Sequence, residues 1–235
     1  MARVRLVILA LFILALACTL PGSTAAADDS RAAAQTRLSL TRLWVGGDSM
    51  AYQIAPTLCA EARKLGVGRC SSLCKSSSGV VRPDFYSWPG HLPVAFRTFR
   101  PRAVVFMIGT NDGQGMRAGG SVYAFGSAGW KRVYNSRVAW MMKTMLANGV
   151  RRVYWIGMPI MRSATFGKRM ALLNSVFKAQ AAAHPGVVYV DAWRLFSSAS
   201  GGFVSGWRSS DGIHFNMTGV HRLCDAVLRL VRRDF

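Results

Sequence analysis

The chain has 235 residues, of which 51% are hydrophobic and 17% are charged, a balance that excludes a disordered tail and a polytopic membrane protein and suits one α/β domain. Lysine and arginine number 30 against 10 aspartates and glutamates, which gives a formal net charge of +20. Multi-ligand Ca²⁺ sites and two-metal catalytic sites need more carboxylates than this, so we expect no metal site.

Residues 1–27 have the layout of a secretory signal peptide. Arg3 and Arg5 precede an unbroken apolar run, Leu6 to Ala17, and small residues follow at 23–27. A helix of this length spans about 18 Å, too little for a bilayer core of about 30 Å. We therefore expect cleavage and an exported protein, periplasmic or extracellular, with no membrane span after cleavage. An uncleaved N-terminal anchor is the alternative.

Residues 28–40 are polar and rich in alanine, so we expect a flexible lead-in to one domain over residues 41–235. Removing residues 1–27, which hold two arginines and no acid, leaves a charge of about +18. Such a field favours an anionic envelope polymer as partner, whereas no recognition motif favours nucleic acid. A well-solvated, arginine-rich surface is the alternative. Whether Cys18 is lipidated stays open.

Four short apolar runs alternate with helical patterns along the rest of the chain. Each run stops at a glycine or an aspartate, and the runs are Leu43–Val45, Ala103–Ile108, Val153–Ile156 and Val187–Val190. Continuous apolar runs are typical of strands buried on both faces of a parallel sheet. The helical patterns cover about residues 50–65, 134–146, 170–183 and 220–231. The alternation predicts a three-layer α/β/α sandwich.

Polar segments follow the first two runs, at the edge where a parallel sheet gathers its functional residues. Ser49 follows the first run on a Gly-rich turn into a helix, whose N-terminal amides favour an anion beside the hydroxyl. A helix cap is the alternative. Asn111 follows the second run and offers two N–H donors that suit an oxyanion. The alternative for Asn111 is an Asx-turn.

Two further segments carry residues of chemical interest. Asp211 precedes His214 by three residues, so its carboxylate can hydrogen-bond Nδ1 of the imidazole and leave Nε2 free to take a proton. A surface turn with an incidental histidine is the alternative. Gly79 lies in a polar loop between the first two runs and can bring its N–H close to a ligand.

Together these segments resemble the SGNH (GDSL-like) hydrolase superfamily, from about Leu43 to the C-terminus. The finer patterns are similar to an exported bacterial subfamily long described as a domain of unknown function; they read SSGVVRPDFYSWP, IGTNDGQ, WIGMP and DGIHF. The resemblance implies a parallel, flavodoxin-like sheet and no cofactor. It also implies that Ser49 is the nucleophile, His214 the base and Asp211 the acid that orients it. The implied oxyanion hole consists of Ser49, Gly79 and Asn111.

The resemblance predicts a serine ester hydrolase. With export and the positive charge, we expect hydrolysis of short-chain acyl esters, foremost O-acetyl, on envelope or extracellular carbohydrate. Two alternatives stay open: an O-acetyltransferase that moves acetyl groups onto a glycan, and a non-catalytic glycan-binding module. Arg82 and Gln114 are candidate substrate-binding residues, although Arg82 can instead pair with Asp84. Trp88, Trp130 and Trp207 can stack on sugar rings or simply pack in the core.

Four cysteines remain after cleavage, and an even number in an oxidising compartment favours disulfides. Cys70 and Cys74 are close enough in sequence to close a small loop, and Cys59 could then pair with Cys224. The sequence leaves the pairing open. The spacing lacks the paired knuckles of a zinc site.

Overall fold

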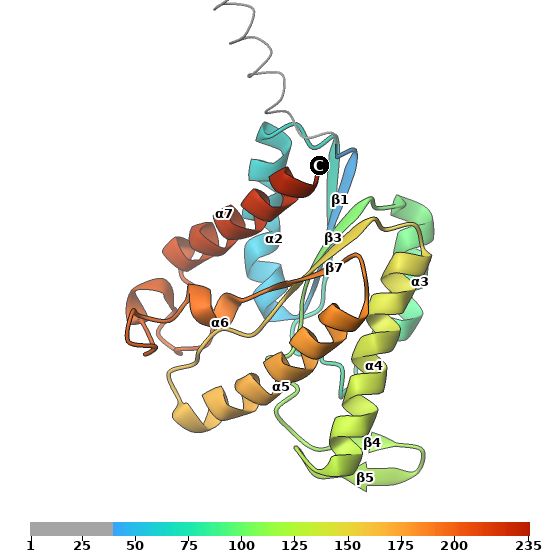
Figure 1. Cartoon of the computed structure of the whole chain (residues 1–235), viewed down its shortest axis with the longest axis vertical. Helices are drawn as coiled ribbons and strands as arrows, with labels where there is room; N and C mark the ends of the chain where they lie inside the picture. The colour runs from blue at the N-terminus through green and yellow to red at the C-terminus, as the bar shows by residue number, and fades with distance from the viewer. Residues whose placement is uncertain (1–39) are drawn as a thin grey trace, which may run out of the picture. The chain divides into compact units, whose positions relative to one another are not determined.

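The computed structural model describes residues 40–235, which form a parallel sheet between two layers of helices (Figure 1). The strand order is β2-β1-β3-β6-β7, the order of flavodoxin-like sheets. The strands are β1 (Arg42–Gly47), β2 (Arg69–Cys74), β3 (Ala103–Met107), β6 (Arg152–Ile156) and β7 (Val187–Val190). The predicted α/β/α sandwich with a parallel flavodoxin-like sheet is therefore confirmed.

Helices α2 and α7 pack together on one face of the sheet, and α3, α4 and α5 cover the other (Figure 1). Their bounds are α2 (Ser49–Lys64), α3 (Trp88–Phe99), α4 (Ala128–Ala147), α5 (Ala164–Ala183) and α7 (Met217–Asp234). Smaller elements join them: α6 (Ala192–Leu195), a 3-10 turn (Ser205–Trp207), and a hairpin of β4 (Met116–Ala118) and β5 (Ser121–Tyr123).

Strand β2, helix α3 and the hairpin have no counterpart among the elements predicted from the sequence. Strand β2 lies at the edge of the sheet and is half exposed, so it carries no apolar run. Helix α3 buries little of its surface and contains Pro93, which conceals the helical pattern. Its start is nevertheless well defined, because Ser87 accepts a hydrogen bond from the Gly90 N–H and a proline occupies the first turn.

The strand register brings the loops after β1, β2 and β3 to the same level. Gly47, the last residue of β1, lies opposite Cys74 of β2 and Met107 of β3. Gly47 has φ +138°, and a Cβ there would lie 1.7 Å from the Met107 carbonyl oxygen, so only glycine fits. This close approach lets the chain leave β1 directly above β3.

Two of the three tryptophans considered for stacking on sugar rings lie in the core, where a sugar cannot reach them. Trp88 and Trp130 are fully buried, at 1% and 0% exposure, and both pack in aromatic clusters. The stacking role is therefore wrong for these two residues. Trp207 is half-buried, and the Arg222 guanidinium carbon lies 4.0 Å from its ring centroid.

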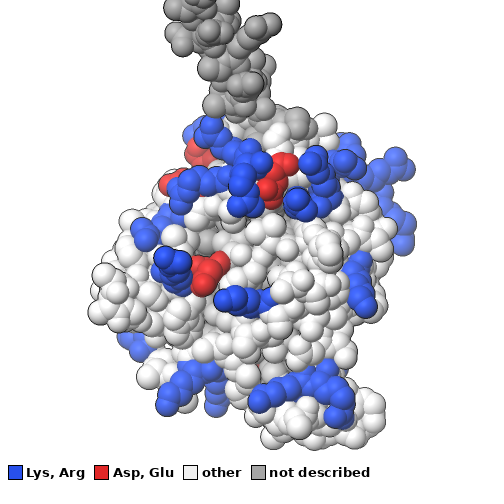
Figure 2. All heavy atoms as spheres, in the orientation of Figure 1, with Lys and Arg blue, Asp and Glu red and all other residues white. Residues whose placement is uncertain are grey.

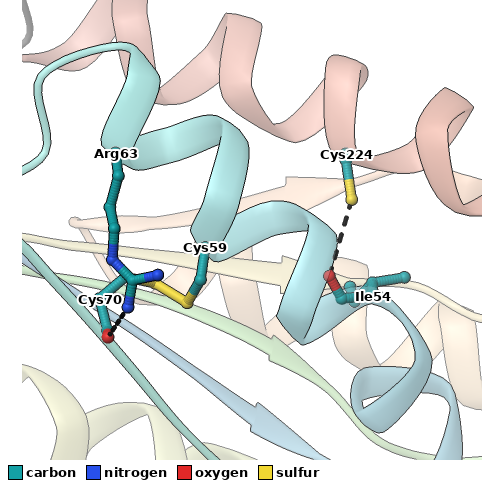
Figure 3. Close-up of a disulfide and its surroundings, with 5 residues drawn as sticks. All are labelled: Ile54, Cys59, Arg63, Cys70 and Cys224. Carbon is teal, nitrogen blue, oxygen red and sulfur yellow. Dashed lines mark hydrogen bonds between the residues drawn. A yellow bond between two sulfur atoms is a disulfide. The ribbon is translucent and has the colours of Figure 1, made fainter.

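One disulfide joins Cys59 of α2 to Cys70 of β2 (Figure 3). This differs from the two pairings considered from the sequence. Cys70 and Cys74 lie on the same extended strand, about 13 Å apart, which is too far for a bond. Cys224 is buried on α7, where its thiol donates to the Ile54 carbonyl at 3.8 Å. Cys74 and Cys224 are free thiols.

The expected signal peptide (1–27), Cys18 and nearly all of the expected lead-in (28–40) lie outside the described residues. Within residues 40–235, no helix has the length and apolar character needed to cross a membrane. In the same part of the chain, no cluster of three or more His, Cys, Asp or Glu side chains could bind a metal ion.

Candidate active site

Ser49 is the first residue of α2, at the carboxyl edge of the sheet. Asp48 caps the helix, since its carboxylate accepts a hydrogen bond from the Met50 N–H at 2.9 Å. The backbone N–H of Asp48 donates to the Met107 carbonyl at 3.0 Å, which anchors the turn to β3. The Ser49 hydroxyl is therefore held at the N-terminus of a helix, where negative charge is stabilised.

A continuous chain of hydrogen bonds joins Ser49, His214 and Asp211. Nε2 of His214 lies 2.9 Å from Oγ of Ser49, and Nδ1 lies 2.6 Å from the Asp211 carboxylate. These side chains are partly open to solvent, with 33% of His214 exposed. The structure thus brings together three residues that are up to 165 positions apart in sequence.

The Asp211 carboxylate is held in its ionised form. Partial burial acts to raise its pKa, but hydrogen bonds from the His214 ring and from the N–H groups of Ile213 and His214 outweigh burial and lower the pKa to about 2. An ionised partner at Nδ1 fixes the imidazole tautomer, so that Nε2 faces the serine hydroxyl as a proton acceptor.

Two residues that no sequence motif indicates, Gln53 and Arg208, hold the His214 loop in place. Gln53 of α2 clamps Phe215 from both sides: its amide oxygen accepts from the Phe215 N–H at 3.0 Å, and its amide nitrogen donates to the Phe215 carbonyl at 3.2 Å. Arg208 donates to the Ile213 carbonyl at 2.7 Å. Burial lowers the pKa of Arg208 to about 10, so it remains charged at neutral pH.

The fully buried Asp48 carboxylate also connects the Ser49 turn to the segment after β3. It accepts hydrogen bonds from the N–H groups of Gly109 and Thr110, and from the Thr110 hydroxyl at 2.6 Å. Burial raises the pKa of Asp48 even though these donors oppose the shift. The two strand ends are thereby fixed relative to one another.

Asn111 and Asp112 bind the loop that carries Gly79. The Asn111 amide donates to the Ser78 carbonyl at 2.9 Å, which uses one of its two N–H bonds. Asp112 accepts from the Val81 N–H at 3.1 Å. Gly79 lies so close that an added Cβ would come within 2.2 Å of the Asp112 carboxylate and 3.7 Å of Cβ of Asn111. The structure therefore places Gly79 and Asn111 side by side.

We expect the buried carboxyl group of Asp112 to make the stability of the protein depend on pH. Burial raises its pKa to about 6, against hydrogen bonds from the Val81 N–H and the Tyr134 hydroxyl. The folded state therefore favours the neutral carboxyl more than the unfolded state does. The contribution of this group to the free energy of unfolding is complete below about pH 4 and is lost as the pH rises through about 6. We expect Asp112→Asn to gain stability relative to the wild type, on the order of 2 kcal/mol, between pH 4 and pH 7.

Urea unfolding of both proteins at several pH values measures this difference. Asp48 is present in both proteins, so the difference between them reports the removal of the Asp112 carboxyl. The Tyr134 hydroxyl can rotate to accept a hydrogen bond from the new amide, so the variant is expected to fold. A difference in unfolding free energy that stays constant with pH would contradict the assignment.

Arg82 and Gln114, the two candidate substrate-binding residues, line one cavity of ≈ 390 Å³ between their loops. Arg82 pairs with Asp84 at 3.3 Å, the alternative considered from the sequence. Gln114 is exposed, and its amide donates to the Asn111 carbonyl at 2.6 Å. Gln114 therefore also supports the turn that carries Asn111.

A second cavity, of ≈ 480 Å³, opens on the α3 and α4 side of Gly79. It is lined mainly by apolar side chains, among them Val80, Tyr86, Val133 and Trp140. Trp140 is exposed. The segment that carries Gly79 thus forms a wall of an apolar pocket.

Several solved structures share the fold. A GDSL-like lipase from Bacteroides thetaiotaomicron has 15% identity and a TM-score of 0.59, with 89% of this chain and 96% of that chain covered. An acetylxylan esterase from Geobacillus stearothermophilus has 16% identity and a TM-score of 0.59, with 84% and 96% covered. A candidate SGNH hydrolase from Slackia heliotrinireducens has 16% identity and a TM-score of 0.58, with 81% and 98% covered.

These likenesses confirm the SGNH hydrolase fold that the motifs predicted. No curated protein matches the sequence significantly. A family model described as "Protein of unknown function (DUF459)" matches residues 42–230, which is most of the chain. The chain therefore belongs to the DUF459 family.

Proposed function

We propose that the protein is an exported serine esterase that hydrolyses short-chain acyl esters, foremost O-acetyl, on envelope or extracellular carbohydrate. The observation that carries the proposal is the hydrogen-bonded series Ser49, His214 and Asp211 at the carboxyl edge of the sheet. A hydroxyl, an imidazole and an ionised carboxylate in this order are the components of nucleophilic acyl transfer.

In the first half of the reaction, Oγ of Ser49 attacks the ester carbonyl while Nε2 of His214 takes the hydroxyl proton. The ionised Asp211 stabilises the imidazolium that forms. As the tetrahedral intermediate collapses, His214 returns the proton to the departing sugar oxygen, and the acyl group remains on Ser49. In the second half, His214 takes a proton from water as the water oxygen attacks the acyl carbonyl. The new tetrahedral intermediate then collapses, His214 returns the proton to Oγ of Ser49, and the free acid and the original Ser49 hydroxyl are restored.

The oxyanion would be held by the N–H groups of Ser49 and Gly79 and by the Asn111 side chain. Neither backbone N–H has a hydrogen-bond partner among the described residues, and Asn111 has one N–H bond to spare. Free donors beside a nucleophile support this role, because they are available to the charge that develops on the carbonyl oxygen.

One neighbour supports the substrate class. It is the acetylxylan esterase, and a catalytic mutant of that enzyme carries alanine in place of a serine. The cavity with Arg82 and Gln114 is more polar than the pocket beside Val133, so we assign the carbohydrate to the former. Export is supported by the signal pattern of residues 1–27 and by the disulfide, which is typical of oxidising compartments.

A fluorophosphonate probe and an acetylated xylooligosaccharide together test the proposal. We expect the probe to label the protein at Ser49, as located by peptide mass spectrometry, and His214→Gln to reduce labelling because the base is lost. We also expect release of free acetate from the oligosaccharide. Acetylated acceptor sugar in place of free acetate would indicate an acetyltransferase. Absence of both labelling and acetyl release would overturn the enzyme proposal and favour a glycan-binding module.

A further inference from the structure

The amino edge of the sheet, opposite the edge that carries Ser49, is crowded with basic side chains. Strands β1, β2 and β6 each begin with an arginine, two more arginines precede β3, and α2, α3 and α7 have basic residues in their last turns. We call this surface the arginine face; it comprises Arg42, Arg63, Lys64, Arg69, Arg97, Arg100, Arg102, Arg151, Arg152, Arg232 and Arg233. Figure 2 shows Lys and Arg gathered at this end, the upper end of the view.

Acidic side chains leave most of this charge uncompensated. Glu61 pairs with Lys64 at 2.7 Å, and Asp234 pairs with Arg152 at 3.6 Å and Arg233 at 3.1 Å. Within residues 40–235, the other side chains of the arginine face have no aspartate or glutamate carboxylate within salt-bridge distance. The face therefore carries a large positive excess over a short distance.

Local structure explains only part of this arrangement. A cation in the last turn of a helix is stabilised by the helix dipole, which accounts for Arg97 and Arg232. Arg100, Arg102 and Arg151 lie in the loops before strands, where no such dipole acts. Their side chains are exposed, and like charges packed together destabilise a protein unless an anion binds.

The arginine face contains a cavity suited to phosphate. This cavity, of ≈ 450 Å³, is lined by Arg42, Arg97, Arg100 and Arg102, together with the polar Asn148, and has no carboxylate in its lining. Guanidinium groups bind phosphate oxygens in a bidentate manner and are more weakly hydrated than ammonium groups. Four of them around one hollow form a site for a phosphate-bearing head group.

The chain enters the described structure at this same end. Leu40 directly precedes β1, so the 39 residues before it, including the apolar run at 6–17, are joined to the protein at the arginine face. Retention of residues 1–27 as an uncleaved anchor, the alternative to cleavage, would hold this face close to lipid. The cations are also spread over the starts of three strands and the last turns of three helices, which fits a planar surface better than a single polymer strand.

We propose that the arginine face binds a bilayer containing anionic phospholipids, with a headgroup phosphate in the cavity of Arg42, Arg97, Arg100 and Arg102. The edge of the sheet that carries Ser49 and His214 then points away from the membrane. Each basic residue near an anionic surface strengthens binding several-fold. This binding does not depend on the proposed esterase activity.

Vesicle co-sedimentation of the full chain tests the proposal. Neutral phosphatidylcholine vesicles measure any contribution of the apolar N-terminal segment, and vesicles with about one third phosphatidylglycerol add the electrostatic part. We expect at least about 10-fold stronger binding to the anionic vesicles at low salt, reduced as ionic strength rises. We expect the triple variant Arg97→Gln, Arg102→Gln, Arg232→Gln to lose most of this difference.

A matched control removes the same charge elsewhere. Lys131→Gln, Lys168→Gln and Lys178→Gln are exposed changes on α4 and α5, and this variant is expected to keep the preference for anionic vesicles. If both triple variants lost the preference for anionic vesicles equally, net charge alone would explain the binding, and the proposed membrane site on the arginine face would be overturned. Binding of soluble polyphosphate is measured alongside. If the arginine-face variant lost polyphosphate binding but kept its preference for anionic vesicles, the face would bind a soluble polyanion, and the membrane proposal would be overturned. Circular dichroism checks that each variant is folded.

Discussion

Replacing Ser49 by alanine is expected to lower kcat for 4-nitrophenyl acetate by at least about 10⁴-fold, because the attacking oxygen is removed and only binding and the oxyanion donors remain. Among residues 40–235, the Ser49 side chain is hydrogen-bonded to His214 alone, and His214 is partly exposed, so the change leaves no buried group without a partner. The free energy of unfolding should therefore change by less than about 0.5 kcal/mol. Stopped-flow and steady-state rates, with urea unfolding alongside, measure both quantities.

Ser76→Ala is the matched control for this prediction. Ser76 is an exposed serine in the loop after β2, near the site but without a part in the proposed reaction. We expect this variant to keep its activity. Unchanged turnover in Ser49→Ala would remove Ser49 from the nucleophile's role, whatever the control shows.

Replacing Asn111 by alanine is expected to lower kcat by about 10²- to 10³-fold with little change in KM, since an oxyanion donor acts mainly in the transition state. The same change removes the hydrogen bond to the Ser78 carbonyl and is expected to cost about 1 kcal/mol of stability. The split between kcat and KM separates the two roles, because a loosened loop would weaken substrate binding as well.

Asn135→Ala provides a comparison of similar chemistry. Asn135 donates to the Lys131 carbonyl on α4 and accepts from Gln180 at 3.0 Å, so its loss affects packing but not the site. We expect a small loss of stability and normal kcat. If Asn111→Ala showed the same profile as Asn135→Ala, Asn111 would be a loop-fixing residue only.

The central part of the fold could be predicted from the sequence because its strands are buried on both faces. The runs at 103–108 and 153–156 are continuous and apolar, and they became β3 and β6. Strand β2, Arg69–Cys74, could not be found in this way, because an edge strand needs no apolar run and is defined by its pairing with β1. The prolines of α3 likewise conceal a helix that tertiary contacts stabilise.

Prediction of the site depended on short motifs. Ser49, Asn111, Asp211 and His214 each follow a recognisable turn, and the structure brings Ser49, His214 and Asp211 into hydrogen-bond contact. Gln53 could not be predicted, because its role comes from a contact with Phe215, 162 residues away. A glutamine within a helix looks the same in sequence whether it is solvated or clamps a distant backbone.

The bond between Cys59 and Cys70 has a consequence for the geometry of catalysis. A slip of β2 by one residue along β1 would shift Gly79 by about 3.3 Å and turn the side chains of the strand to the opposite face. Edge strands are prone to such slips since they are paired on one side only. A covalent link from the helix of Ser49 to the second residue of β2 forbids this movement. Oxidation of one thiol pair would thereby keep Ser49, the proposed nucleophile, and the loop of Gly79, the proposed oxyanion donor, in register.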